Sequence, residues 1–103
     1  MEWVRAMATE KVDTNECIGS TVVGGHWIAI FCVEGQYYAT SNICTHGRAP
    51  LSKGYLEGYL IECPLHQGRF DVRTGQAVAP PCTENVRSFP VKLDGGYVYV
   101  DIG

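Results

Sequence analysis

Residues 21–33 read Thr-Val-Val-Gly-Gly-His-Trp-Ile-Ala-Ile-Phe-Cys-Val, which is two apolar runs on either side of a glycine pair. Val, Ile, Thr and aromatic residues favour strands, and Gly24-Gly25 suits a tight turn, so this stretch predicts a β-hairpin. Glu34-Gly35 then turns the chain into another apolar and aromatic run at 36–40. Three successive strands joined by short turns indicate an antiparallel sheet.

The rest of the chain repeats this pattern. The last strand alternates, with Val98 and Val100 on one face and Tyr97 and Tyr99 on the other, as a half-buried strand does. Pro90 is expected at an edge or a bulge because it lacks an amide hydrogen. A short helical turn is expected at 13–17, and further strands are expected at 59–62, 70–72, 76–78, 86–93 and 97–102. The fold class is therefore all-β and antiparallel, a sandwich or a small barrel.

The length, charge and cysteine content of the chain limit its domain number, its classes of partner and its location. The chain has 103 residues without a linker or a repeat, so we expect a single domain over 1–103. Its net charge is −3 and its pI is about 5.5, which argues against nucleic acid and anionic membranes as partners. The longest apolar run, 27–33, is too short to cross a bilayer. Five cysteines are an odd number, and no secretory signal is visible, so we expect a reducing, cytoplasmic location.

Two loops between the strands, at about 42–53 and 63–69, carry the unusual chemistry. The first contains Cys44-Thr45-His46 and the second contains Cys63-Pro64-Leu65-His66, with 16 residues between His46 and Cys63. Each loop thus offers one thiol and one imidazole.

Two metal centres use such a set of donors. Tetrahedral Zn²⁺ accepts two Cys and two His, but zinc fingers group Cys with Cys and place the His pair on a helix. A [2Fe–2S] centre in which two His replace two Cys needs two thiolates on one iron and two imidazoles on the other. A mixed pair in each of two facing loops could deliver one ligand to each iron from either side. The mixed loops fit the cluster better, and a zinc-stabilised module without a redox role remains the alternative.

The segment from Cys44 to Pro81 resembles a Rieske [2Fe–2S] domain, specifically the small ferredoxin component of bacterial aromatic-ring dioxygenase systems. The matching residues are Cys44-Thr45-His46-Gly47, Leu51-Ser52-Lys53-Gly54, Cys63-Pro64-Leu65-His66-Gln67-Gly68-Arg69-Phe70-Asp71, Thr74-Gly75 and Pro80-Pro81. The resemblance implies an antiparallel Rieske-like β-sandwich with two cluster-binding loops and a proline loop at about 79–82. It implies that Cys44 and Cys63 bind the inner iron, and that His46 and His66 bind the outer iron. Many members have Gly at the position of Gln67, so the backbone is expected to differ slightly there.

The function implied by the resemblance is electron transport. The protein would be a monomeric, soluble one-electron carrier with one [2Fe–2S] cluster, and it would have no catalytic residue of its own. It would accept electrons from a flavin-dependent ferredoxin reductase and pass them to the terminal oxygenase of a system that hydroxylates aromatic compounds. A catalytic oxygenase subunit needs a second iron site with two more His, whereas only His26 is left over.

Departures from related families refine this expectation. High-potential Rieske proteins of respiratory chains carry two further cysteines where this chain has Ala49 and Leu65, and hydroxyl donors where it has Gly68 and Phe70. Fewer hydrogen bonds to the cluster lower its reduction potential, so we expect a value toward the lower end of roughly −150 to +300 mV. The remaining cysteines are interpreted as structural: Cys32 as a core residue, and Cys17 and Cys82 as residues without a partner at a diagnostic spacing. The place of Cys82 directly after Pro80-Pro81 leaves a position near the cluster as the alternative for this residue.

Overall fold

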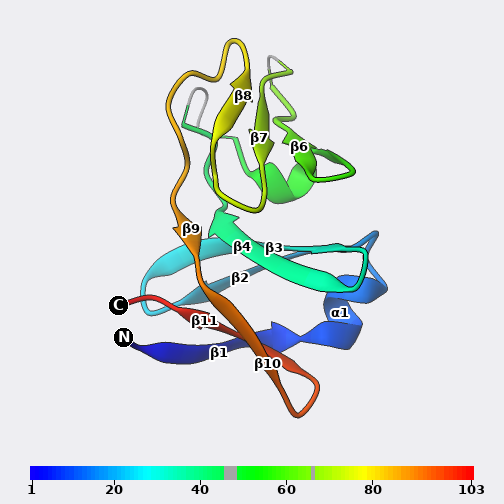
Figure 1. Cartoon of the computed structure of the whole chain (residues 1–103), viewed down its shortest axis with the longest axis vertical. Coiled ribbons are helices and arrows are strands. Elements are labelled where there is room, and N and C mark those ends of the chain that lie inside the picture. Colours follow the sequence, from blue (N-terminus) through cyan, green and yellow to red (C-terminus); the bar gives the residue numbers. More distant parts are fainter. Residues whose placement is uncertain (46–48, 66) are drawn as a thin grey trace.

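The computed structural model describes residues 1–45, 49–65 and 67–103. In this part of the chain the strands form three antiparallel sheets (Figure 1). The first sheet has the order β1-β11-β10, the second β2-β3-β4-β9 and the third β5-β6-β7-β8. Their bounds are β1 Trp3–Ala8, β2 Ile18–Val23, β3 His26–Val33, β4 Gln36–Ser41, β5 Tyr55–Glu57, β6 Leu60–Glu62, β7 Arg69–Asp71, β8 Ala77–Ala79, β9 Ser88–Phe89, β10 Val91–Asp94 and β11 Tyr97–Asp101. The helices are α1, Thr9–Asp13, and the 3₁₀ turn η1, Leu51–Lys53.

The predicted hairpin at the start of the second sheet is confirmed. β2 and β3 pair from Ile18↔Phe31 to Val23↔His26, and β4 pairs with the other edge of β3. Gly24 and Gly25 have φ of +54° and +79°, the left-handed region that this two-residue turn requires. The antiparallel β fold expected from sequence is therefore observed.

The central strand β3 separates two hydrophobic cores, because alternate side chains point to opposite faces of a sheet. Ile28 and Ile30 face the lower core, which lies between the first two sheets. Ala29 and Phe31 face the upper core, which lies between the second sheet and the third. Burial on both faces explains the unbroken apolar run at 27–33. The lower core contains Val12, Ile28, Ile30, Ala39, Phe89, Val98 and Val100; the upper core contains Ile18, Ala29, Phe31, Val33, Cys44, Ala49, Leu51, Ile61, Cys63, Phe70, Val72, Cys82 and Val86.

Pro90 marks the place where the chain changes sheet. β9, just before it, pairs with β4 of the second sheet, and β10, just after it, pairs with β11 of the first. The strand expected at 86–93 is therefore divided into two strands of different sheets. The division falls at Pro90, where an edge or a bulge is expected because proline lacks an amide hydrogen. Val98 and Val100 of β11 are buried as their alternation predicts.

The helical turn expected at 13–17 is wrong by about one turn. The helix α1 instead spans Thr9–Asp13, and its Val12 packs into the lower core. Glu16 and Cys17 have φ of 57° and 65°, which no right-handed helix accommodates. The strands β1 and β5 were not expected from the sequence.

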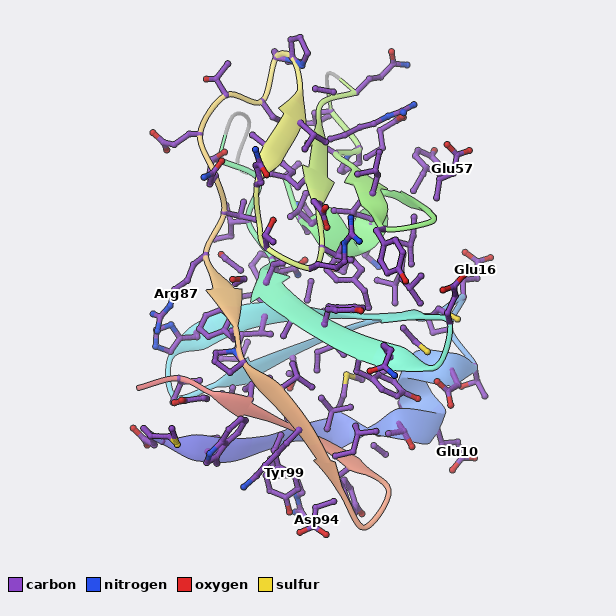
Figure 2. All side chains as sticks on the ribbon, in the orientation of Figure 1. Glu10, Glu16, Glu57, Arg87, Asp94 and Tyr99 are labelled. Carbon is purple, nitrogen blue, oxygen red and sulfur yellow. The ribbon has the colours of Figure 1, made fainter. Side chains whose placement is uncertain are left out.

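The three sheets define a long axis with two ends. In Figure 1 the third sheet lies at one end, and the first two sheets, with both chain termini, lie at the other. Glu10, Glu16, Glu57, Arg87 and Asp94, all labelled in Figure 2, are exposed around the outside. No helix in the described ranges is long and apolar enough to span a membrane.

Candidate metal centre

The first predicted ligand loop is closed at its base by backbone hydrogen bonds. The amide of Cys44 donates to the carbonyl of Ala49 over 2.8 Å, and the amide of Leu51 donates to the carbonyl of Asn42 over 2.7 Å. Asn42 is fully buried, and its Oδ1 accepts the amide of Ser52 over 2.7 Å. Its backbone amide donates to the carbonyl of Trp27, so the loop is fixed to the end of the second sheet.

The second loop closes in the same way. The amide of Cys63 donates to the carbonyl of Gly68 over 2.7 Å, again five residues further along the chain. Gln67 has a φ of 60°, in the left-handed region that favours glycine. This conformation costs a non-glycine residue of order 1 kcal/mol. The slight difference in backbone path from other family members at this position stays a prediction.

The two loops bring the predicted sulfur ligands together. Cys44 and Cys63 are 0% and 1% exposed, and both belong to the upper core. Burial raises the pKa of the Cys63 thiol, and a hydrogen bond with the Cys44 side chain raises it further. The two residues are 19 positions apart in sequence, yet their thiols meet inside the protein.

The other two predicted ligands, His46 and His66, lie outside the described residues, as do Gly47 and Arg48. Among the residues that the structure does describe, no group of three or more His, Cys, Asp or Glu side chains forms a metal site. All five cysteines are described, and none forms a disulfide. Two buried thiols at the hydrogen-bonded bases of two loops are nevertheless ligands that an iron–sulfur centre can use.

A third thiol lies at this site, contrary to the expectation for Cys82. Its Sγ is 3.7 Å from that of Cys44, and the side chain is 4% exposed. A Cβ placed at Gly68 would collide with the Cys82 sulfur, so the glycine leaves the space that Cys82 fills. The interpretation of Cys82 as a residue without a partner was therefore wrong. The alternative for Cys82, a position near the cluster that its place directly after Pro80-Pro81 indicates, agrees with this contact.

The proline loop is attached to both ligand loops. Thr45, which lies between the predicted ligands of the first loop, donates its hydroxyl to the carbonyl of Glu84 over 2.5 Å. Cys82 packs on Gly68 of the second loop. The three loops are thus held together by direct contacts.

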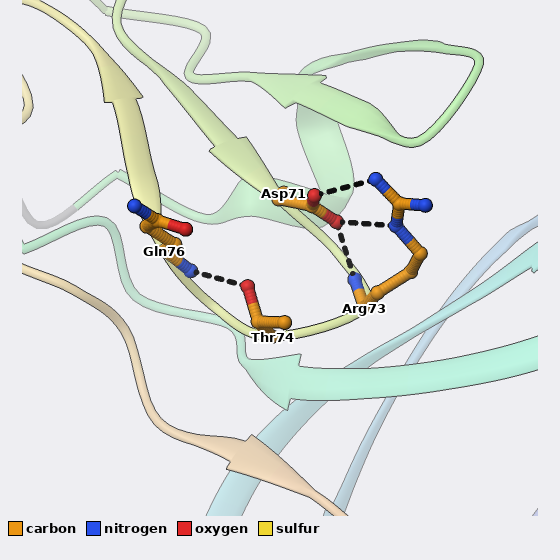
Figure 3. Close-up of polar contacts among 4 residues, drawn as sticks. All are labelled: Asp71, Arg73, Thr74 and Gln76. Atoms are coloured by element: carbon orange, nitrogen blue, oxygen red, sulfur yellow. Dashed lines mark hydrogen bonds and ion pairs between the residues drawn. The ribbon is translucent and has the colours of Figure 1, made fainter.

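The matching residues beyond the ligands build the turn between β7 and β8 (Figure 3). The Asp71 carboxylate accepts the amide of Arg73 over 2.9 Å and its guanidinium over 3.0 and 2.8 Å, which lowers the pKa of Asp71. Gly75 has a φ of +81°, and a Cβ there would collide with the carbonyl of Val86. The amide of Val86 donates to the carbonyl of Gly75 over 2.9 Å. This part of the motif therefore supports the returning proline loop.

The remaining side chains near the loops have ordinary roles or lie on the surface. Arg69 pairs with Glu62 across β6 and β7 over 3.2 Å. His26 is a strand residue with its ring edge-on to Phe89. Leu65 of the second loop is 49% exposed.

Comparison with known proteins agrees with this architecture. Residues 2–90 match the Rieske [2Fe-2S] domain family. The chain is 48% identical over 101 residues to the ferredoxin component of the naphthalene 1,2-dioxygenase system of Pseudomonas aeruginosa, covering 98% of this chain and 96% of that protein. The fold matches the ferredoxin of carbazole 1,9a-dioxygenase from Nocardioides aromaticivorans with a TM-score of 0.89 and 35% identity, over 97% of each chain.

A second solved structure, the complex of reduced oxygenase and oxidized ferredoxin in carbazole 1,9a-dioxygenase, contains a chain that matches with a TM-score of 0.85 and 40% identity. The match covers 95% of this chain and 91% of that one. The present chain belongs to the Rieske [2Fe-2S] domain family. Within it, the chain is a ferredoxin, the electron-transfer component of an aromatic ring-hydroxylating dioxygenase system. Its cofactor is the Rieske [2Fe–2S] cluster, so the zinc alternative loses its support.

Proposed function

We propose that Cys44 and Cys63 bind one iron of the cluster and that His46 and His66 bind the other. The whole of 1–103 would act as one domain. The observation that carries this assignment is the meeting of two fully buried thiols at loops closed by the same five-residue hydrogen bond. When bound, the cluster takes up and releases one electron without making or breaking a substrate bond.

The residues around the thiols keep water away from the inner side of the site. Ala49 and Leu51 of the first loop and Phe70 of β7 are buried beside Cys44 and Cys63 in the upper core. An apolar wall lowers the local dielectric constant and excludes solvent, two of the means by which a protein sets a cluster's potential. The backbone hydrogen bonds at the loop bases hold Cys44 and Cys63 in place at the site.

The partner proteins are expected to bind at the exposed face of the two ligand loops. We infer that a flavin-dependent reductase and the terminal oxygenase contact this end of the molecule in turn. The complex of oxygenase and ferredoxin among the related structures supports such an encounter. Exposed Leu65 and half-buried Pro64 of the second loop would give a small apolar contact, typical of transient redox complexes.

The proposal includes the state and location of the protein. We infer a monomer in the cytoplasm, with neither a membrane nor nucleic acid as a partner. The net charge of −3 is unfavourable for phosphate-rich surfaces. Five thiols outside any disulfide suit a reducing compartment.

The test is spectroscopic. Anaerobically reconstituted protein is expected to be coloured, to contain acid-labile sulfide, and to show the electron paramagnetic resonance of a reduced Rieske centre. Cys44→Ser and Cys63→Ser are expected to lose that signal, whereas Cys17→Ser keeps it as the matched control. His66→Cys is expected to lower the potential sharply, because an anionic thiolate replaces a neutral imidazole.

Two results would overturn the assignment. A colourless protein that binds zinc in place of iron and sulfide would restore the alternative of a zinc module. A Rieske signal that survives Cys44→Ser or Cys63→Ser unchanged would show that other residues bind the cluster.

A further inference from the structure

The third buried thiol at the site, Cys82, is not among the four proposed ligands. It is 4% exposed, and its sulfur lies 3.7 Å from that of Cys44, within the range of a hydrogen bond between sulfurs. The two residues are 38 positions apart, so the contact is made entirely by the folding of the proline loop onto the first ligand loop.

The surroundings hold Cys82 in this position. The absence of a side chain at Gly68 makes room for the sulfur on one side. The amide of Cys82 donates to the carbonyl of Ala79 over 3.2 Å, which closes a turn around Pro80-Pro81. Thr45, the residue next to Cys44, donates its hydroxyl to the carbonyl of Glu84, two residues beyond Cys82. The direction of the side chain is therefore set by packing from several sides and not by the loop alone.

Iron binding decides which of the two sulfurs, Cys44 or Cys82, donates the hydrogen bond. A cysteine that binds iron does so as a thiolate, which carries no proton and can only accept a hydrogen bond. Without metal either sulfur could be the donor. In the loaded protein the hydrogen of this contact has to come from Cys82.

We propose, on the basis of the ligand assignment above, that Cys82 donates an S–H hydrogen bond to the cluster ligand Cys44 and thereby raises the reduction potential. A donor at a ligand sulfur withdraws electron density from it and stabilises the reduced, more negative state. Cys82 is thus a positioning and tuning residue that touches a ligand and does not bind the metal. A thiol is a weak donor, so its effect is smaller than that of a hydroxyl group in the same place.

The test compares reduction potentials of cluster-loaded variants. Cys82→Ala removes the donor and is expected to shift the potential to a more negative value. Cys82→Ser retains a donor and is expected to stay at or above the wild-type value. Cys32→Ala, a cysteine that packs against the lower core, is the matched control and is expected to leave the potential unchanged.

A second readout follows the hydrogen itself. The infrared S–H stretch of Cys82 is expected at a lowered frequency in the loaded protein, and this band is expected to be missing in Cys82→Ala. If Cys82→Ala does not retain the cluster, Cys82→Val fills the space without a donor and takes its place in the comparison with Cys82→Ser.

The outcomes separate this inference from the ligand assignment. A wild-type protein without a Rieske signal would refute the assignment itself. A normal signal with equal potentials in the wild type and the donor-free variant would refute only the role of Cys82. Equal shifts in the Ser and donor-free variants would also refute it, because packing alone would then explain the change.

Discussion

The buried side chain of Asn42 accepts the amide hydrogen of Ser52 through its Oδ1 over 2.7 Å, across the base of the first ligand loop. Its backbone carbonyl accepts the amide of Leu51, so Asn42 makes two hydrogen bonds that join the two ends of the first ligand loop. Within the described residues, Nδ2 of Asn42 has no hydrogen-bond partner. The hydrogen bond that Oδ1 accepts from Ser52 is therefore the interaction that stabilises this polar side chain in the core.

We expect Asn42→Ala to destabilise the cluster-loaded protein by about 1 to 2 kcal/mol. The amide of Ser52 loses its acceptor, and this cost is partly offset because the unpaired Nδ2 is removed as well. Urea unfolding followed by the cluster absorbance measures the change. Asn85→Ala is the matched control, because the exposed Asn85 uses the same atom to accept the amide of Ala77 over 3.0 Å. Equal losses in the two variants would show that burial of Asn42 is unimportant.

We expect Asp71→Asn to lower stability at pH 7 by roughly 0.5 to 1 kcal/mol, a value reduced for solvent screening because the Arg73 side chain is 49% exposed. Hydrogen bonds from Arg73 hold the pKa of Asp71 below its ordinary 3.8 in the folded protein. Such a carboxylate contributes fully above the unfolded pKa, and the contribution is lost as the pH falls through the lower folded pKa.

The difference between wild type and Asp71→Asn is therefore expected to be constant from neutral pH to about pH 5 and to shrink below pH 3.8. Urea unfolding midpoints of the cluster-free proteins across this range provide the measurement. Asp94→Asn, at the exposed end of β10, serves as the control. A stability gap that widened on acidification would contradict a lowered pKa of Asp71 in the folded protein.

Removal of the cluster is expected to loosen the two cores unequally. Cys44 and Cys63 belong to the upper core, whereas the lower core contains neither. A metal that binds only the folded site stabilises what surrounds it, so its loss lowers the protection of that region first. Hydrogen exchange after chelation should accelerate in β5 to β8 and remain slow in β11. Uniform acceleration throughout the chain would show that the two cores unfold together.

The strand pattern and the two ligand motifs could be read from the sequence because they are local. Alternation in β11 and the glycine turn before β3 each depend on residues within one strand or hairpin. The pairs Cys44 with His46 and Cys63 with His66 are likewise short-range patterns. The strand β1 could not be predicted because its side chains are half-buried without a clear alternation, and it pairs with β11 at the opposite end of the chain.

What the amino-acid order determined by itself was the antiparallel β class and the chemical nature of the four proposed donors. Only the tertiary structure decided that β3 would be shared between two cores, and that Cys82 would lie against Cys44. A contact between residues 38 positions apart depends on how loops pack over a glycine. No short-range periodicity encodes such packing, because its energy arises between segments that meet only after the chain has folded.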